Sequence, residues 1–376
     1  MTRHRTLLLA AAALAFAAVA VSGPAYAEKN RYHAQALVSD GFVPGTKLDT
    51  HLVNGWGVAF NPVGFVWVAD NGTGFATLYD GLGNPQSLVV SIPAAPGSEH
   101  GKPTGIVFSG SNDFRVAAAG TTGPSRFIFA TEDGLIAGWA PSVDFTHALQ
   151  AYPPAGAPPS PAVYKGLALA NNGVGNFLYA ADFVGGKIDV FNASFAKVTL
   201  AGNFADPALP DEFSPFNIQE INGHLFVTYA KHEPGENDET PGKGLGAVNE
   251  FDANGHLLRR VTTGGKLNAP WGIALAPATF GKFANNLLVG NFGDGTVNAY
   301  DATSGKFRGQ LKGTNNKVLH LDGLWGMAFG NDLNNQPKGT LFFAAGPDEE
   351  NHGVYGRIDP APKENGADEG DDDGDN

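Results

Sequence analysis

Four oxygen-bearing side chains flank apolar, β-prone runs at widely separated points of the chain. They are Asp70, Asp182, Asn217 and Asn291. Carboxylate and amide oxygens are the ligands that Ca²⁺ prefers, and Mg²⁺ takes them together with more waters. If the fold brings the four together, they predict a divalent cation site that polarises a carbonyl and lowers the pKa of a bound water. The alternative is that each Asp or Asn caps its own turn after a strand, as these residues commonly do.

A second set of polar and aromatic side chains lies at the ends of the same or related runs, and we predict that it forms a ligand-binding face. The set is Asn54, Trp56, Thr104, Lys165, Trp271, Asp294, Trp325 and His352. Its Trp residues recur at one position of a repeat. They fit an aromatic platform for a sugar or another flat ligand, and they fit packing between neighbouring repeats equally well.

Other kinds of chemistry have no support in the sequence. The chain has no Cys, which excludes a thiol nucleophile, a thiolate metal site and disulfides. It has no Gly-x-Ser-x-Gly elbow, no Walker loop and no paired metal-binding His motif. Glu132-Asp133-Gly134 reads first as a hairpin turn between two apolar strands, with Glu132 as a weaker candidate general acid. The formal net charge of −13 and the lack of a basic patch exclude a nucleic-acid partner.

A repeated unit sets the architecture that must position these residues. It opens with a polar residue or Pro, continues with Gly or Asn, and runs into an apolar strand. The equivalent positions are Gly57, Gly105, Gly166, Asn217, Gly272 and Gly326, spaced by 48, 61, 51, 55 and 54 residues. Gly here lets the backbones of crowded inner strands approach one another. A repeat of about 50 residues with four short strands is typical of a propeller blade.

The second strand of each unit follows its opening run. We expect these strands at 65–69, 114–118, 177–181, 224–230, 286–290 and 340–345. The sixth unit has three strands, the last at 353–358, and we expect residues 32–39 to supply its fourth. This pairing closes the ring and leaves no open sheet edge. The sequence therefore predicts an all-β fold, a single six-bladed β-propeller with four-stranded blades, in which the N-terminal strand completes the last blade.

Two long insertions interrupt the repeat. The Pro-rich segment 152–161 is expected to be an extended loop between blades two and three. The segment 231–246 lies inside blade four and carries Glu233, Glu236, Asp238 and Glu239. Loops of this length inside a compact domain are functional or mobile.

The repeated motifs resemble an uncharacterised family of secreted bacterial β-propellers related to NHL-repeat proteins. The resemblance rests on Asn54-Gly55-Trp56-Gly57, Trp67-Val68-Ala69-Asp70-Asn71, Pro103-Thr104-Gly105, Tyr164-Lys165-Gly166, Ala269-Pro270-Trp271-Gly272 and Leu324-Trp325-Gly326, among others. It implies export and a six-bladed fold, and it implies no known reaction or catalytic residue.

The two ends of the chain differ in composition from the repeats. Arg3 and Arg5, an apolar run at 7–21 and Ala25-Tyr26-Ala27 fit a signal peptide over 1–27, so we expect a secreted or periplasmic protein with no membrane span after cleavage. The propeller is expected over 28–360. Residues 361–376 hold seven acidic residues and one Lys, which predicts a disordered acidic tail.

The sequence favours two functions. The first is a monomeric binding or interaction module that uses its axial face for a protein, carbohydrate or small-molecule ligand of unknown identity. The second is a metal-dependent hydrolase or lyase acting on a lactone, sugar or ester, with Ca²⁺ or another divalent cation as its cofactor. The catalytic residues are unknown in either case.

Overall fold

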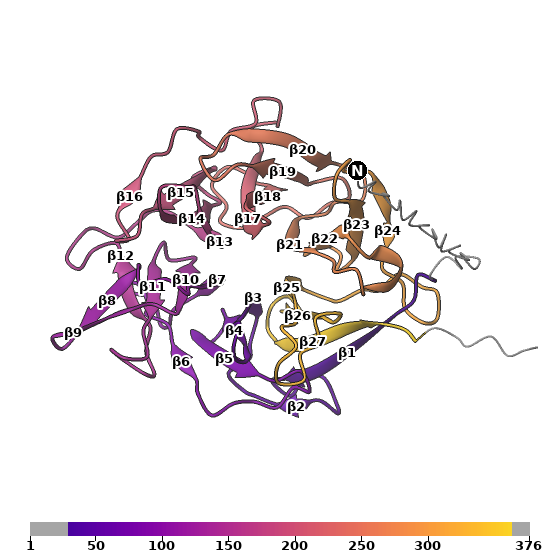
Figure 1. Ribbon diagram of the computed structural model, residues 1–376, viewed down its shortest axis with the longest axis horizontal. Coiled ribbons are helices and arrows are strands. Elements are labelled where there is room, and N and C mark those ends of the chain that lie inside the picture. The colour runs from indigo at the N-terminus through magenta and orange to yellow at the C-terminus, as the bar shows by residue number, and fades with distance from the viewer. Residues whose placement is uncertain (1–28, 363–376) are drawn as a thin grey trace, which may run out of the picture.

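A computed structural model describes residues 29–362, and in this part six sheets of four or five strands surround a central axis (Figure 1). Its one helix is the short 3-10 turn η1 (Gly281–Phe283). No helix of the described part is long and apolar enough to cross a membrane. The all-β fold and the six-bladed propeller are thus confirmed, whereas the expected signal peptide and nearly all of the acidic tail lie outside the described residues.

The first three blades follow the chain from their inner to their outer strands. Blade 1 is β3 (Gly55–Phe60), β4 (Val66–Asp70), β5 (Phe75–Tyr79) and β6 (Val90–Ser91). Blade 2 is β7 (Pro103–Phe108), β10 (Phe127–Thr131), β11 (Ile136–Trp139) and β12 (Leu149–Tyr152). Blade 3 is β13 (Tyr164–Asn171), β14 (Asn176–Asp182), β15 (Lys187–Phe191) and β16 (Lys197–Val198).

The remaining blades complete the ring. Blade 4 is β17 (Phe213–Ile221), β18 (His224–Lys231), β19 (Ala247–Phe251) and β20 (Leu257–Thr263). Blade 5 is β21 (Pro270–Leu275), β22 (Asn286–Asn291), β23 (Val297–Asp301) and β24 (Phe307–Gln310). Blade 6 is β25 (Leu324–Phe329), β26 (Leu341–Ala345), β27 (Val354–Pro360) and β1 (Tyr32–Ser39), with β2 (Lys47–Leu48) beyond it.

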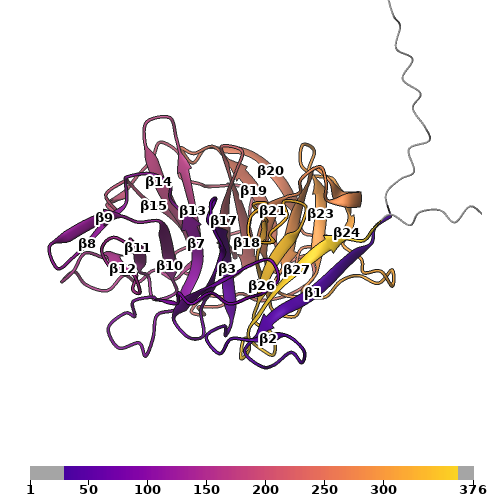
Figure 2. The ribbon, with the colours of Figure 1, turned by 60° about the horizontal axis from the view of Figure 1, so that its bottom comes forward.

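The first and last strands of the described chain lie side by side in blade 6 (Figure 2). Strand β1 pairs antiparallel with β27, from Tyr32 opposite Pro360 to Ser39 opposite Val354. The β27 edge therefore has a partner, which protects it from pairing with another chain.

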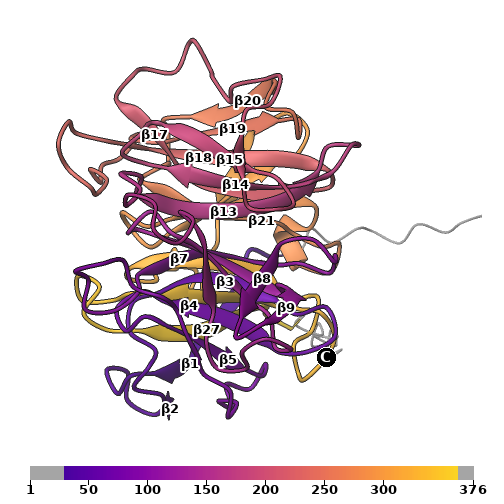
Figure 3. The same ribbon diagram turned by 90° about the vertical axis from the view of Figure 1, so that its left-hand side faces the viewer.

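Blade 2 differs from the expected strand pattern. Residues 114–118 were expected to form its second strand, but β8 (Arg115–Ala118) pairs with β9 (Thr121–Pro124) in a separate two-stranded hairpin (Figure 3). The second strand is instead β10, all five residues of which are buried. Ala119 and Gly120 have φ of +49° and +80°, a tight turn that folds β9 back on β8. This insertion accounts for the longest repeat spacing.

The repeated Gly positions lie where inner strands of adjacent blades touch. A Cβ on Gly105 would stand 2.3 Å from the backbone nitrogen of Leu167 in blade 3, and a Cβ on Gly326 would stand 2.3 Å from the carbonyl oxygen of Trp56 in blade 1. Real Cβ atoms do not approach backbone so closely, so a larger residue here would force neighbouring blades apart. The crowding expected from the repeat is therefore present.

Apolar cores fill the seams between adjacent blades. In blade 1, Val66 and Val68 of β4 pack with Phe342 and Tyr355 of blade 6, whereas Trp67 packs toward blade 2. This follows from the alternation of side chains along a strand. Whether a residue occupies an odd or an even position in its strand thus determines which of the two neighbouring seams its side chain enters. The polar residues at the ends of these strands follow the same rule.

Candidate functional site

Aromatic side chains from five blades meet at the centre of the ring. The indole rings of Trp56 and Trp325 stack with their centroids 3.7 Å apart, and Trp271 meets Trp325 edge-on at 5.8 Å. All three side chains are buried. Phe183, Phe216 and Phe292 pack against them. The recurrent Trp residues therefore form the packed floor of the axial face, so their indole faces are covered and are not an open platform for a sugar.

Lys165 lies directly above this floor. Its Nζ stands 5.3 Å from the Trp56 ring centroid, a distance typical of a cation–π contact. The same nitrogen lies 2.7 Å from Asp238, 3.3 Å from Glu132 and 3.8 Å from Glu239. The lysine side chain is only 1% exposed. An ammonium group so deeply buried is stable only because carboxylates and aromatic faces replace its hydration.

A hydrogen-bonded chain links a fourth carboxylate to this group. Glu350 accepts a hydrogen bond of 2.7 Å from the amide of Asn54, and Glu132 accepts one of 3.0 Å from the amide of Asn71. The two amides contact each other at 3.4 Å. The Trp325 indole N–H donates to Asn54 at 3.0 Å, which fixes the orientation of that amide. We call Glu132, Asp238, Glu239 and Glu350, with Lys165, the axial cluster.

The pKa values of the cluster reflect an excess of negative charge. Burial alone would lower the pKa of Lys165, but Glu132, Glu239 and Asp238 outweigh it and raise that pKa, so the amine stays protonated and is no nucleophile. Burial raises the pKa of Glu239 despite the opposing effect of Lys165. Burial, followed by the charge of Glu239, raises the pKa of Glu350 to about 7. The cluster thus holds more carboxylates than its one ammonium can neutralise.

The backbone around Glu350 is strained. Asp348, Glu349 and Glu350 have φ of +56°, +54° and +67°, the left-handed region that costs an L-residue roughly 1–2 kcal/mol. Asn54 also has a positive φ, +47°. Both residues of the Asn54–Glu350 hydrogen bond therefore have a left-handed backbone conformation that residues other than Gly adopt infrequently. Such strain is concentrated at functional sites.

Five of the eight residues predicted for the ligand face lie at this centre: Asn54, Trp56, Lys165, Trp271 and Trp325. The Thr104 hydroxyl instead donates to the carbonyl of Tyr164 at 2.7 Å and links blades 2 and 3. Asp294 bonds to Thr296 and Asn291 within its own turn. The His352 side chain bonds to Asp40 and stacks on Phe42, while its carbonyl accepts a hydrogen bond of 3.0 Å from the Asn54 N–H.

Of the four residues predicted to share a metal ion, three have separate partners. Asp182 binds Lys187 at 2.7 Å, and the Asn217 amide donates to the Trp271 carbonyl at 2.9 Å. Asn291 donates to the carbonyl of Lys266, while Asp70 is buried without a partner in the described chain. Asp70, Asp182 and Asn291 share the strand parity of their seam-packing neighbours, so they enter three different seams rather than the axis. Within residues 29–362, no three His, Asp or Glu side chains are grouped to hold a metal.

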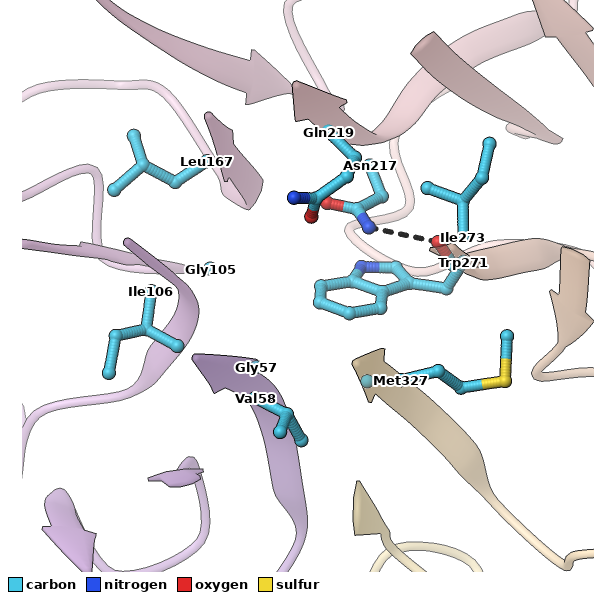
Figure 4. A pocket seen from close by; sticks show the side chains of 11 residues that line it. Gly57, Val58, Gly105, Ile106, Leu167, Asn217, Gln219, Trp271, Ile273 and Met327 are labelled. Carbon is cyan, nitrogen blue, oxygen red and sulfur yellow. Dashed lines mark hydrogen bonds between the residues drawn. The ribbon is translucent and has the colours of Figure 1, made fainter. Parts of the chain in front are cut away.

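A small cavity of about 20 Å³ lies further along the inner strands, beside Trp271 (Figure 4). It is lined by Gly57, Val58, Gly105, Ile106, Leu167, Asn217, Gln219, Trp271, Ile273, Gly326 and Met327. A cavity of this size holds about one water molecule. This cavity is therefore too small for an organic ligand.

Sequence reasoning missed part of the cluster. Glu350 was not among the residues predicted from the sequence. Asp238 and Glu239 were noted only as acids of the long loop between β18 and β19, and Glu132 mainly as part of a turn. The order of the strands could have indicated these residues. Each of their loops follows the second strand of a blade, so it lies on the same face of the propeller as the beginning of the inner strands.

Comparisons with known proteins place the chain in a family without an assigned activity. It is 32% identical over 340 residues to an uncharacterized protein of Acanthamoeba polyphaga mimivirus, covering 86% of this chain and 78% of that protein. A second uncharacterized mimivirus protein is 30% identical over 334 residues, covering 86% and 84%. The chain belongs to the same family as these viral proteins. No family model matches the sequence.

Solved structures show the same fold at low identity. A streptogramin B lyase has a TM-score of 0.50 at 12% identity, covering 88% of this chain and 98% of that one. The soluble aldose sugar dehydrogenase of Escherichia coli has a TM-score of 0.52 at 13% identity, covering 88% and 100%. These similarities establish the propeller and no activity. The propeller part of the expected resemblance is confirmed, while its bacterial, secreted and NHL-related parts stay predictions.

Proposed function

We propose that this protein is a binding propeller whose axial face receives a positively charged group of a ligand. The observation that supports this most directly is the axial cluster, in which three carboxylates from blades 2 and 4 lie within 4 Å of one ammonium, and a fourth, Glu350 of blade 6, is held by Asn54. An amine or guanidinium placed beside Glu350 and Asp238 would offset the remaining negative charge. An anionic ligand would add to the repulsion.

The charge state of Glu350 supports a cationic ligand. With a pKa raised to about 7 by burial and by the neighbouring carboxylates, this side chain is partly protonated at neutral pH. A bound cation would favour its ionised form, so binding would release a proton. Asp238, whose side chain is 80% exposed, would meet the ligand first.

Isothermal titration tests this proposal. The cationic probes are spermidine, glucosamine and a hexalysine peptide, which represent a small molecule, a carbohydrate and a protein segment, with glucose and hexaglutamate as neutral and anionic controls. We expect binding by at least one cationic probe, weakened by salt, and none by the controls. Binding of the anionic probe in preference to every cation would contradict the proposal.

Matched variants locate the binding. Asp238→Asn and Glu350→Gln each remove one cluster charge and should weaken binding by roughly fivefold, about 1 kcal/mol for a partly exposed charge pair. Glu236→Gln removes an equal charge from the same loop outside the cluster and should leave affinity unchanged. Equal losses in all three variants would show that only the overall charge matters.

One observation keeps a hydrolase or lyase acting on a lactone, sugar or ester as a second candidate. A carboxyl with a pKa near 7 is suited to general acid–base catalysis at neutral pH. Glu350 would then transfer a proton while Asn54 holds it in place. This candidate would be supported if the wild type hydrolyses or cleaves members of a panel of lactones and esters and Glu350→Gln abolishes that activity. If the wild type acts on none of them, the binding function is favoured.

We also propose that the protein is exported and acts as a monomer in the periplasm or outside the cell. Support comes from the signal-peptide pattern of residues 1–27 alone. The test is the mass of the secreted protein, which should correspond to a chain that begins after Ala27.

A further inference from the structure

The seams between blades contain a polar position that recurs at the same register. In blade 1, Asp70 ends the second strand, and Thr77 on the third strand lies opposite Val68, two residues earlier. In blade 3, Asp182 ends the second strand, and Asp189 lies opposite Ala180. Because residues two apart share a face of a strand, each pair points into the same seam. The two blades thus offer a direct comparison.

In blade 3 the chain supplies the counter-charge itself. Lys187 lies 2.7 Å from Asp182 and 2.5 Å from Asp189. Lys197 also binds Asp189, and the Tyr164 hydroxyl donates to it at 2.9 Å. Two ammonium groups therefore neutralise two carboxylates at this position.

In blade 5 the position carries no charge that needs neutralising. It holds the amides of Asn291 and Asn298, and both amides donate to the carbonyl of Lys266. Both amide oxygens are buried without a hydrogen-bond partner in the described chain, and the Asn291 amide also donates to the carboxylate of the exposed Asp294 at 3.1 Å. Blades 3 and 5 are thus electrically balanced, one by lysines and the other by uncharged side chains.

Blade 1 has a carboxylate here and no cation to match it. Asp70 is 0% exposed, and neither of its carboxylate oxygens has a hydrogen-bond partner among the described residues. The Thr77 hydroxyl, 1% exposed, also has none. Thr77 is nevertheless close enough to oppose the rise that burial causes in the pKa of Asp70. Three buried oxygen atoms that lack a hydrogen bond of standard geometry therefore lie on the same face of blade 1, with no basic side chain to match the carboxylate.

The surroundings add negative charge rather than positive. Asp49 increases the pKa of Asp70 further through its own charge. Its oxygens accept hydrogen bonds from the Tyr79 hydroxyl at 3.0 Å and bond to the His51 ring at 3.0 Å, so they hold these partners and not Asp70. A lone buried carboxylate is among the least favourable groups in a protein interior.

We propose that the seam between blades 6 and 1 binds one hard metal cation, Ca²⁺ or Na⁺, through the carboxylate of Asp70 and the hydroxyl of Thr77. The cation neutralises the carboxylate of Asp70, as the lysine ammonium groups neutralise the carboxylates in blade 3. Both ions prefer oxygen ligands, and the nearby Asp49 carboxylate stabilises their charge. This site lies outside the axial cluster, so it is independent of the proposed function.

Thermal unfolding of the whole mature chain tests the proposal. The protein is dialysed against EDTA in a choline-based buffer and then titrated with CaCl₂, NaCl or additional choline chloride at matched ionic strength. Ca²⁺ or Na⁺ should raise the Tm with a saturating dependence, because each binds the folded state alone, and choline should not. The ion that acts at the lower concentration is the ligand. Equal responses to all three salts, or none, would overturn the proposal.

Two isosteric variants place the ion. Asp70→Asn should abolish the specific rise in Tm, and Thr77→Val should reduce it, whereas Asp301→Asn, at an exposed turn of blade 5, should retain it in full. Mass spectrometry of the equilibrated protein provides a readout that does not depend on stability, and we expect one bound ion per wild-type chain. An undiminished response in Asp70→Asn would assign the ion elsewhere and overturn the proposal.

Discussion

The axial cluster and the seam between blades 6 and 1 both bury carboxylates, but they differ in the source of positive charge. In the axial cluster, Lys165 contributes an ammonium 2.7 Å from Asp238 and 3.3 Å from Glu132. In the seam, Asp70 has no basic side chain beside it in the described chain, and of its neighbours only Thr77 opposes the rise in its pKa. The cluster is thus partly balanced from within, whereas the seam depends on a proton or an outside cation.

This difference separates the features that the repeated fold determines from those that depend on the side chains of a single blade. The propeller supplies equivalent backbone positions, so the polar residues that end the second strands of blades 1, 3 and 5 occupy equivalent places. Neutralisation depends on single side chains such as Lys187, which one blade has and another lacks. We therefore expect charge-removing substitutions to have opposite effects in different blades.

The largest effect should come from removing the ammonium of the axial cluster. Lys165→Met keeps the length of the side chain but leaves four carboxylates without a counter-charge. Loss of one partner of a buried ion pair costs about 3–5 kcal/mol. Urea unfolding at pH 7 should show a loss of this size, and a smaller one at pH 5, where Glu350 and Glu239 bind protons more readily.

Lys187→Met is the matched control for this prediction. Lys187 also contacts two carboxylates, but its side chain is 48% exposed, so water can replace the ammonium. We expect a loss of about 1 kcal/mol or less. If both variants lose the same stability, burial of the lysine is not what makes the axial cluster sensitive.

Glu350→Gln should stabilise the protein at alkaline pH. The pKa of Glu350 is raised in the folded state, so the stability from its protonated form is complete below the unfolded pKa and is lost as the pH rises through about 7. Each pKa unit corresponds to about 1.4 kcal/mol, which sets an upper limit of about 3 kcal/mol. The free energy of unfolding of wild type minus variant, measured from pH 5 to pH 9, should fall across this interval. If the difference in the free energy of unfolding does not change with pH, Glu350 does not interact with the other charges of the axial cluster.

Two seam variants should respond to pH in opposite directions. Burial alone would raise the pKa of Asp189, but hydrogen bonds from Lys187, Lys197 and Tyr164 together outweigh it and lower that pKa. The contribution of Asp189 to stability is therefore present above the unfolded pKa and lost in acid. Asp189→Asn should therefore lose about 1–3 kcal/mol at neutral pH, and less as the pH falls.

Asp70→Asn should behave in the reverse way in cation-free buffer. Burial raises the pKa of Asp70, so its protonated form supports the fold at low pH and that support disappears as the pH rises toward the raised pKa. The variant should equal the wild type near pH 4 and exceed it in stability at higher pH. Equal pH profiles for Asp70→Asn and Asp189→Asn would abolish the contrast between blades 1 and 3.

The sequence predicted the fold well and the site incompletely, for identifiable reasons. The repeat at Gly57, Gly105 and its equivalents is a direct consequence of crowding at the axis, so it was sufficient for the blade number. The hairpin β8–β9 was misassigned because an inserted hairpin has the same alternation as a blade strand. Which seam Asp70 enters depends on strand parity, and the approach of Glu350 to Lys165 depends on loops from separate blades, so neither was visible in local sequence.

The smallest expected effect concerns the cation response of blade 3, and it separates the seam proposal from a shared axial metal. If Asp70, Asp182, Asn217 and Asn291 held one ion together, Asp182→Asn would remove a ligand and abolish the rise in Tm caused by Ca²⁺ or Na⁺. If the ion lies with Asp70 and Thr77, Asp182→Asn removes only the bond to the half-exposed Lys187, at a cost of about 1 kcal/mol or less. The variant should then melt slightly earlier than the wild type, with an unchanged shift on adding the ion. Because Asp182 and Asp70 occupy the same register in different blades, loss of the response in both variants would favour a common site, whereas loss in Asp70→Asn alone would confine the ion to the seam between blades 6 and 1.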